Sequence, residues 1–192
     1  MTSVVIPDSV TTIGNSAFSQ CDSLTSVKIP DSVTYIGGGV FYDCYSLTNV
    51  ELPDSITSIS GWAFYSCTNL SSVEIPDSVT TIGDWAFSGC ISLTSVTIPD
   101  SVTSIGDYAF YLCFNLTSVV IGNSVTSIGE YAFALCDSLT SVTFENPNGW
   151  FVADSITATS GTYISRVDLS DTATAATYLK DTYRYRYWKR GE

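Results

Sequence analysis

Six cysteines recur along the chain at a constant step of 23 residues. They are Cys21, Cys44, Cys67, Cys90, Cys113 and Cys136. Thiols can ligate zinc, form disulfides or pack as small apolar side chains. If each step is one turn of a stack, neighbouring cysteine Cα atoms lie about 5 Å apart, inside disulfide range. Side chains in such a column point the same way and cannot converge tetrahedrally on a metal. The spacing therefore favours buried thiols over disulfides and over zinc.

Other residues with catalytic chemistry are sparse. The chain has no histidine, which removes the commonest general base near neutral pH and every histidine-based triad. Gly37, Gly38 and Gly39 form a glycine run, but the Gly-Lys-Ser or Gly-Lys-Thr of a phosphate-binding loop does not follow. The sequence predicts a protein that is not an enzyme and that uses no cofactor or metal.

An aspartate also recurs at the 23-residue step, directly after a proline. This column holds Asp8, Asp31, Asp54, Asp77 and Asp100. Like charges one turn apart repel, and a bridging calcium ion would relieve that repulsion. Aspartate after proline also caps turns in water, and we favour this second interpretation.

These columns belong to a repeat that reads L-T-S-V-x-I-P-D-S-V-T-x-I-G-x-x-A-F-x-x-C-x-S. Val27, Lys28 and Ile29 alternate apolar and polar, as in a strand with one buried face, and the following proline ends the strand. Such a unit cannot bury its own apolar face, so the units must stack into a solenoid in which each gives one short strand to a parallel sheet. The Ile-Gly step predicts a second extended piece, and the Ala-Phe step predicts a single helical turn. The phenylalanine column is Phe18, Phe41, Phe64, Phe87, Phe110 and Phe133.

The repeat resembles the leucine-rich repeat, and within it the BspA-like (Treponema pallidum type) subclass, over residues 1 to about 144. L-x-x-V-x-I-P, I-G, A-F and C occur at the same spacings there. Three departures are Val40 for alanine, Ser60 for glycine, and Gly122-Asn123 for Pro-Asp, where the array begins to end. The resemblance implies a leucine-rich repeat solenoid of the α/β class, rich in β structure. It implies right-handed 23-residue repeats stacking a parallel sheet, with a small C-terminal α/β cap. It also implies a bacterial cell-surface or secreted protein that acts in adhesion.

The net charge of −12 lies entirely on residues 1–144. Residues 1–144 hold 13 acids and a single base, Lys28, whereas residues 145–192 hold six of each. An acidic surface repels nucleic acid and anionic membranes, so neither is expected as a partner. No apolar run is long enough for membrane insertion, and the sequence contains no signal peptide.

The expected organisation is a leucine-rich array over residues 1–144, with about six repeats plus a final strand, and a capping segment over residues 145–192. Met1 takes the register position of Leu24, so the first strand has no preceding turn. We expect a fragment of a longer protein that lacks its N-terminal cap; end-to-end self-association through this uncapped turn is the alternative.

Three features of residues 145–192 predict the cap. Ser160-Gly161 suits a hairpin turn, and Ser170 or Asp171 suits the N-cap of a short helix. Aromatic and basic residues alternate over residues 183–190. This last pattern could bind nucleic acid; we favour a final strand whose aromatic face covers the last turn.

The predicted concave face of the sheet is the first candidate binding surface. Its outward residues are Ser26, Lys28, Asn49, Glu51, Ser72, Glu74 and Thr97, with Ser95, Ser118 and Val120 in the same two columns. The hydroxyl column is permissive, so the variable column of Lys28, Glu51 and Glu74 is expected to set specificity for a protein ligand. The alternative is a solvated face without a ligand.

A ladder of aromatic residues is the second candidate surface. It contains Trp62, Trp85, Tyr108 and Tyr131, with Tyr42, Tyr65 and Tyr111 three residues after members of the same column. A stripe of rings could hold a glycan or an apolar partner, but packing between repeats on the convex side is the favoured interpretation.

The sequence as a whole predicts a non-catalytic protein-binding module of a bacterial cell-surface or secreted protein. Adhesion to host or neighbouring-cell proteins is the expected role. A spacer that projects another domain, and a carbohydrate-binding surface on the aromatic ladder, are the two alternatives.

Overall fold

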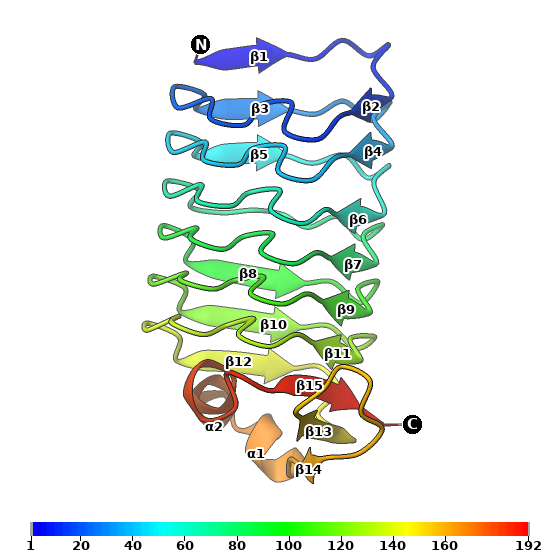
Figure 1. Ribbon diagram of the computed structural model, residues 1–192, viewed down its shortest axis with the longest axis vertical. Helices are drawn as coiled ribbons and strands as arrows, with labels where there is room; N and C mark the ends of the chain where they lie inside the picture. The colour runs from blue at the N-terminus through cyan, green and yellow to red at the C-terminus, as the bar shows by residue number, and fades with distance from the viewer. Residues whose placement is uncertain (1, 192) are drawn as a thin grey trace.

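The computed structural model describes residues 2–191, so the predicted register position of Met1 lies outside the described residues. Each repeat makes one turn of backbone, and the turns stack into an elongated solenoid (Figure 1). Strands and short helices close its C-terminal end. We number the repeats one to six, from residues 1–23 to residues 116–138. The predicted solenoid with a C-terminal α/β cap is confirmed.

The first ladder of strands pairs in parallel, each residue lying opposite the one 23 positions away. Val27, Val96 and Val119 point inward and are at most 3 % exposed, whereas their neighbours face solvent, as the alternation predicts. We call the solvent side of this ladder the sheet face. Its strands are β1 (Ser3–Val5), β3 (Ser26–Lys28) and β5 (Asn49–Glu51), then β8 (Ser95–Ile98), β10 (Ser118–Ile121) and β12 (Ser141–Phe144).

A second ladder confirms the extended piece predicted at the Ile-Gly step. Threonine hydroxyls reinforce it, as where Thr80 Oγ1 donates to the carbonyl of Thr57 over 3.0 Å. Its strands are β2 (Thr12–Ile13), β4 (Tyr35–Ile36), β6 (Ser58–Ile59), β7 (Thr81–Ile82), β9 (Ser104–Ile105) and β11 (Ser127–Ile128).

The helical turn predicted at the Ala-Phe step is wrong. This part of each repeat is a series of turns in which two residues take left-handed backbone, such as Trp62 (φ 55°) and Ser66 (φ 56°). The amide of Phe64 between them donates to Ala86 of the next repeat over 2.8 Å. Hydrogen bonds between repeats therefore alternate with turn hydrogen bonds within one, such as that from the amide of Tyr65 to the carbonyl of Trp62 over 3.1 Å.

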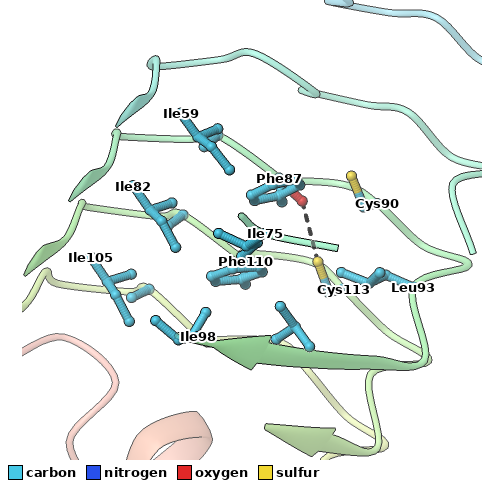
Figure 2. Close-up of a cluster of buried hydrophobic side chains, with 14 of the residues drawn as sticks. Ile59, Ile75, Ile82, Phe87, Cys90, Leu93, Ile98, Ile105, Phe110 and Cys113 are labelled. Atoms are coloured by element: carbon cyan, nitrogen blue, oxygen red, sulfur yellow. Dashed lines mark hydrogen bonds between the residues drawn. The ribbon is translucent and has the colours of Figure 1, made fainter. Parts of the chain in front are cut away.

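The core is a set of stacked columns of buried side chains. Phe64, Phe87 and Phe110 lie ring over ring, with centroids 5.1–5.2 Å apart. Beside them the thiol of Cys113 donates to the carbonyl of Phe87 over 3.3 Å (Figure 2). Five of the six cysteines are buried free thiols, as predicted, and Cys21 in the first repeat is half-buried. A thiol with a carbonyl partner fits the interior as a small, satisfied side chain.

Repeat four breaks the first ladder, contrary to the prediction that each repeat contributes a strand. Residues 72–75 are extended but unpaired, so the ladder divides into a sheet that ends at β5 and another that begins at β8. Val73 is half-buried there, although its counterparts Val50 and Val96 are buried. The interruption thus exposes part of the apolar column.

The charge column disfavours pairing on the β5 side of this break. In the paired register Lys28 lies opposite Glu51, and their Nζ and Oε2 atoms are 3.0 Å apart. The next member of the column is Glu74. Pairing β5 with repeat four would set Glu51 directly beside Glu74, and like charges on paired strands are destabilising.

The second ladder breaks one repeat earlier, between β4 and β6, where Ser60 stands in the glycine column. A Cβ at Gly83 would lie 2.6 Å from the amide nitrogen of Gly61, so paired turns have no room for one. Gly83 donates its amide to Ile59 over 2.8 Å. At Ser60 the side-chain Oγ instead donates to Ile36 over 2.6 Å, and the two strands remain unpaired.

Residues 145–191 close the C-terminal end. β13 (Trp150–Ala153) and β14 (Thr162–Tyr163) form an antiparallel hairpin. The tight turn predicted at Ser160-Gly161 is wrong, because residues 154–161 connect the two strands. β15 (Tyr187–Arg190) pairs antiparallel with both β13 and β11 and so joins the hairpin to the second ladder. The array boundary at residue 144 stays a prediction.

Two short helices lie beside this hairpin. α2 (Thr172–Thr177) packs on β12 and begins at Asp171, as predicted, whose carboxylate accepts from the amide of Thr174 over 2.8 Å. The helix was predicted to run through Tyr178 and Leu179, and these residues begin the π-helical turn η1 (Tyr178–Thr182). α1 (Arg166–Ser170) was not predicted.

The aromatic and basic strand β15 covers the last turn. Trp188 is 1 % exposed and stacks on Phe144 with centroids 6.0 Å apart. Arg190 donates from its guanidinium to the carbonyl of Asn123 over 2.6 Å, at the point where Gly122-Asn123 replaces Pro-Asp. These contacts give β15 a structural role.

Candidate binding surfaces

The sheet face carries the residues predicted for a protein ligand, and the structure exposes most of them, whereas Ser118 and Val120 are half-buried. Ser26, Lys28, Asn49, Glu51, Ser72, Glu74, Ser95 and Thr97 point to solvent. Lys28 and Glu51, the first members of the charge column, form an ion pair. The hydrogen bond and the charge attraction of this pair raise the pKa of Lys28. Glu74 is set apart from them by the break in the ladder.

A hollow opens at that break, which we call the repeat-four hollow. Its volume is about 910 Å³, within the range of ligand-binding pockets. A smaller hollow of about 380 Å³ lies on the other side of residues 72–75, toward β8. The larger one is lined by Asn49, Val50, Glu51, Leu52, Asp54, Ser72, Val73, Glu74, Ile75, Pro76, Asp77 and Ser78.

The lining of the repeat-four hollow has free hydrogen-bonding groups. Within the described chain, the main-chain groups of residues 71–75 make no backbone hydrogen bond. The hydroxyl oxygen of Ser78 is buried and has no partner, although Ser101 at the same position of repeat five donates to Val79 over 2.6 Å. Unpaired buried groups of this kind are rare in folded proteins, and the unpaired main-chain groups of the rung are open to an added strand.

Four carboxylates surround these groups, from Glu51, Asp54, Glu74 and Asp77. The nearest base in the array, Lys28, is engaged by Glu51. The hollow is therefore acidic, polar at its main chain and apolar at Val50 and Val73. Neither the break nor the hollow was predicted; the signal that could have found them is the pair of glutamates at successive positions of one column.

Most rings of the aromatic ladder pack on one another between repeats. Trp85, Tyr108 and Tyr131 stack with centroids 4.0 and 4.8 Å apart, so their faces cover one another. Tyr42 and Tyr65 stack at 4.8 Å. Stacked rings offer only their edges to a ligand.

Trp62 is different, because its side chain is 49 % exposed. Repeats one and two carry Ser16 and Gly39 at its position of the column. A shallow hollow of about 420 Å³ lies over these small residues and is lined also by Asn15, Gly38 and Tyr42. The ladder therefore leaves one indole open at its N-terminal end.

Members of two acidic columns accept hydrogen bonds from the backbone of the next repeat. Asp100 accepts from the amide of Asn123 over 2.7 Å. A further column that was not singled out does the same, since Asp84 accepts from the amide of Asp107 over 2.9 Å and Asp107 from that of Glu130 over 3.0 Å. Burial raises the pKa of Asp107. Within residues 2–191, no group of three or more acidic or cysteine side chains is arranged to hold a metal ion.

The sequence matches the family model described as BspA type Leucine rich repeat region, in six copies over residues 1–80 and 57–174. The chain belongs to this family. Its members are repeat scaffolds, and the leucine-rich fold generally mediates protein interactions. No curated protein sequence matches the chain.

Solved structures of leucine-rich repeat proteins share the fold. A leucine-rich repeat protein from Bacteroides ovatus is 36% identical, with a TM-score of 0.68, over 70% of this chain and 35% of that one. The T. pallidum leucine-rich repeat protein is 31% identical, with a TM-score of 0.65, over 72% of this chain and 78% of that one. A leucine rich cell surface protein from Faecalibacterium prausnitzii is 34% identical, with a TM-score of 0.50, over 76% of this chain and 32% of that one. The chain thus spans about a third of the Bacteroides protein.

In the part of the chain that the structure describes, no helix has the length and apolar character needed to cross a membrane.

Proposed function

We propose that this chain is a non-catalytic protein-binding module of a bacterial cell-surface or secreted protein. Its ligand is a protein on a host or neighbouring cell, held on the sheet face. Membership of the BspA-type family supports the binding role, and the similar Faecalibacterium cell surface protein supports the location.

The repeat-four hollow is the observation that carries the proposal. It lies on the sheet face, among the residues of the variable charge column, and combines about 910 Å³ of space with unsatisfied polar groups. A spacer without a ligand has no use for such a feature, because an unpaired rung weakens the stack. The hollow therefore favours a ligand over a spacer.

The test is a binding screen of the purified chain against immobilised extracellular-matrix proteins. A triple variant, Lys28→Glu with Glu51→Lys and Glu74→Lys, is measured beside it. We expect at least one captured protein and a loss of binding of tenfold or more in the variant, because the charge column is reversed.

Asp22→Lys is the matched control, since it changes the net charge by the same amount on an exposed turn away from the sheet face. The control should bind as the unchanged chain does. Absence of any captured protein, or equal losses in the triple variant and the control, would contradict the proposal.

A carbohydrate-binding role has one observation in its favour, the open face of Trp62 over the shallow hollow. A glycan array compares Trp62→Ala with Trp85→Ala, whose ring is stacked on Tyr108. Glycan binding that is lost only in Trp62→Ala would support this second function; an array without signal would end it.

A further inference from the structure

We infer that the repeat-four hollow takes an extended segment of polypeptide that pairs as a strand with the open edge of the sheet. The segment alternates basic and small apolar residues. This inference rests on the proposed function and specifies how the ligand is held and which ligand chemistry fits.

Strand edges without a partner border the hollow. β5 has a partner on its β3 side but none toward repeat four, and residues 72–75 have none on either side. Each residue of an unpaired strand presents an amide donor and a carbonyl acceptor in the plane of the sheet. An added strand satisfies such groups through its own main chain, which is a recurring mode of peptide recognition.

The dimensions of the site limit the length of the segment. Its long sides are residues 49–52 and 72–76. At about 3.3 Å per residue, four to five extended residues span these edges. A volume of about 910 Å³ leaves room for their side chains.

The acidic residues around the hollow favour basic side chains on the outward side of the segment. Glu51 and Glu74 lie on the sheet face, and Asp54 and Asp77 lie where the two extended pieces end. The repeats hold a single base, Lys28, and Glu51 already engages it. Lysine or arginine on the outward side of the ligand would separate Glu51 from Glu74 and neutralise the repulsion that disfavours pairing between them.

The valine column on the inward side of the hollow favours apolar residues at the alternate positions of the segment. The valine column continues through Val50 and Val73, and Val73 is only partly buried because its rung is unpaired. A small apolar side chain on the ligand restores this column, since successive residues of a strand point to opposite faces. A segment with both features therefore alternates basic and apolar residues.

The test uses the full chain and an acetylated, amidated seven-residue peptide of alternating lysine and valine. Calorimetry measures its affinity, and amide hydrogen exchange locates it. We expect binding, with exchange at residues 72–75 slowed tenfold or more. The same peptide carrying N-methyl groups on alternate residues lacks donors along one edge and should bind at least tenfold more weakly.

Two further comparisons test the charge argument. A peptide of alternating glutamate and valine should not bind. Glu74→Lys should weaken binding of the lysine peptide tenfold or more, whereas Glu145→Lys, the same change on an exposed residue outside the hollow, should leave it unchanged.

Binding that N-methylation leaves intact, or protection that maps away from residues 49–52 and 72–76, overturns the inference. Absence of binding by the lysine peptide overturns it too. A protein captured in the screen and lost in the triple variant, with no effect of N-methylation, leaves the proposed function standing and removes only strand addition. A screen without any captured protein removes the proposed function itself.

Discussion

At the scale of single residues, the buried cysteine column ties the stability of the array to pH. Burial raises the pKa of the Cys44 thiol to about 11 and also raises the pKa of Cys67, Cys90 and Cys113. In an unfolded chain a thiol titrates near pH 8.5. Above that pH the unfolded chain releases protons that the folded chain retains, so the free energy of unfolding falls as pH rises.

The prediction is a loss of stability between about pH 8.5 and 10.5, by about 1.4 kcal/mol per pH unit for each such thiol. Urea unfolding under reducing conditions at several pH values measures it. Cys90→Ala should show a slope shallower by about that amount. A free energy of unfolding that does not change between pH 8 and 10 would be inconsistent with buried, protonated thiols.

The glycine column gives a second prediction at the residue scale. A Cβ at Gly106 would lie 2.6 Å from the amide nitrogen of Asp84, whereas one at Gly14 would meet nothing within 4 Å. Gly106→Ala should therefore destabilise the protein by about 1–3 kcal/mol, and Gly14→Ala should stay within about 0.5 kcal/mol of the original. Chemical denaturation of both variants measures the difference; equal effects would mean that turn spacing does not explain the column.

At the scale of elements, one substitution should favour closing the first ladder between β5 and repeat four. Glu74→Lys places opposite charges side by side at positions 51 and 74, which favours pairing of β5 with repeat four. We expect amide protection at residues 72–75 to rise toward that of β8 and the melting temperature to increase by about 1–3 °C. Unchanged exchange at these amides would show that another cause opens the rung.

The strands themselves were predictable because their cause is local. The alternation around Val27 and the proline after it specify a short strand with one buried face, and the structure has β3 there. The helical turn was mispredicted because every second backbone donor bonds to the next repeat, as Phe64 does to Ala86. The sequence of a single repeat does not show whether its backbone donors bond within the repeat or to the next one. Ser60 was recognised as a departure, but its consequence depends on the backbone of the preceding turn.

The candidate site was predictable in part. The outward positions of the sheet face follow from the period of two, so Lys28, Glu51 and Glu74 were placed correctly on one face. The hollow depends on which rungs pair, and this is decided by contacts between repeats. Asp171 at the start of α2 was found because an N-cap is local, whereas α1 escaped because five residues give too little periodicity.

At the scale of the whole molecule, an array with 13 acids and one base creates a long-range field. A basic ligand is attracted by this field, and salt screens it over about 8 Å at physiological ionic strength. Association of the lysine peptide should therefore slow severalfold between 0.05 and 0.5 M salt, with a smaller change in dissociation rate. Surface plasmon resonance measures both rates; an association rate independent of salt would contradict electrostatic recognition.

The same linear architecture places the open rung inside the stack, since each repeat contacts only its neighbours. Repeats one to three, and repeats five and six with the final strand β12, then form two paired stretches of the first ladder on either side of repeat four (Figure 1). An opening between two stable stretches is a local feature that can accept a ligand without unfolding the solenoid.

The most direct test of this account is amide hydrogen exchange on the purified chain without any ligand. The account expects residues 72–75 to exchange at least about tenfold faster than the paired strands β8 and β10, which carry equivalent residues. Equal protection across the three rungs would show that the ladder is continuous through repeat four, and both the hollow and the binding mode built on it would be contradicted.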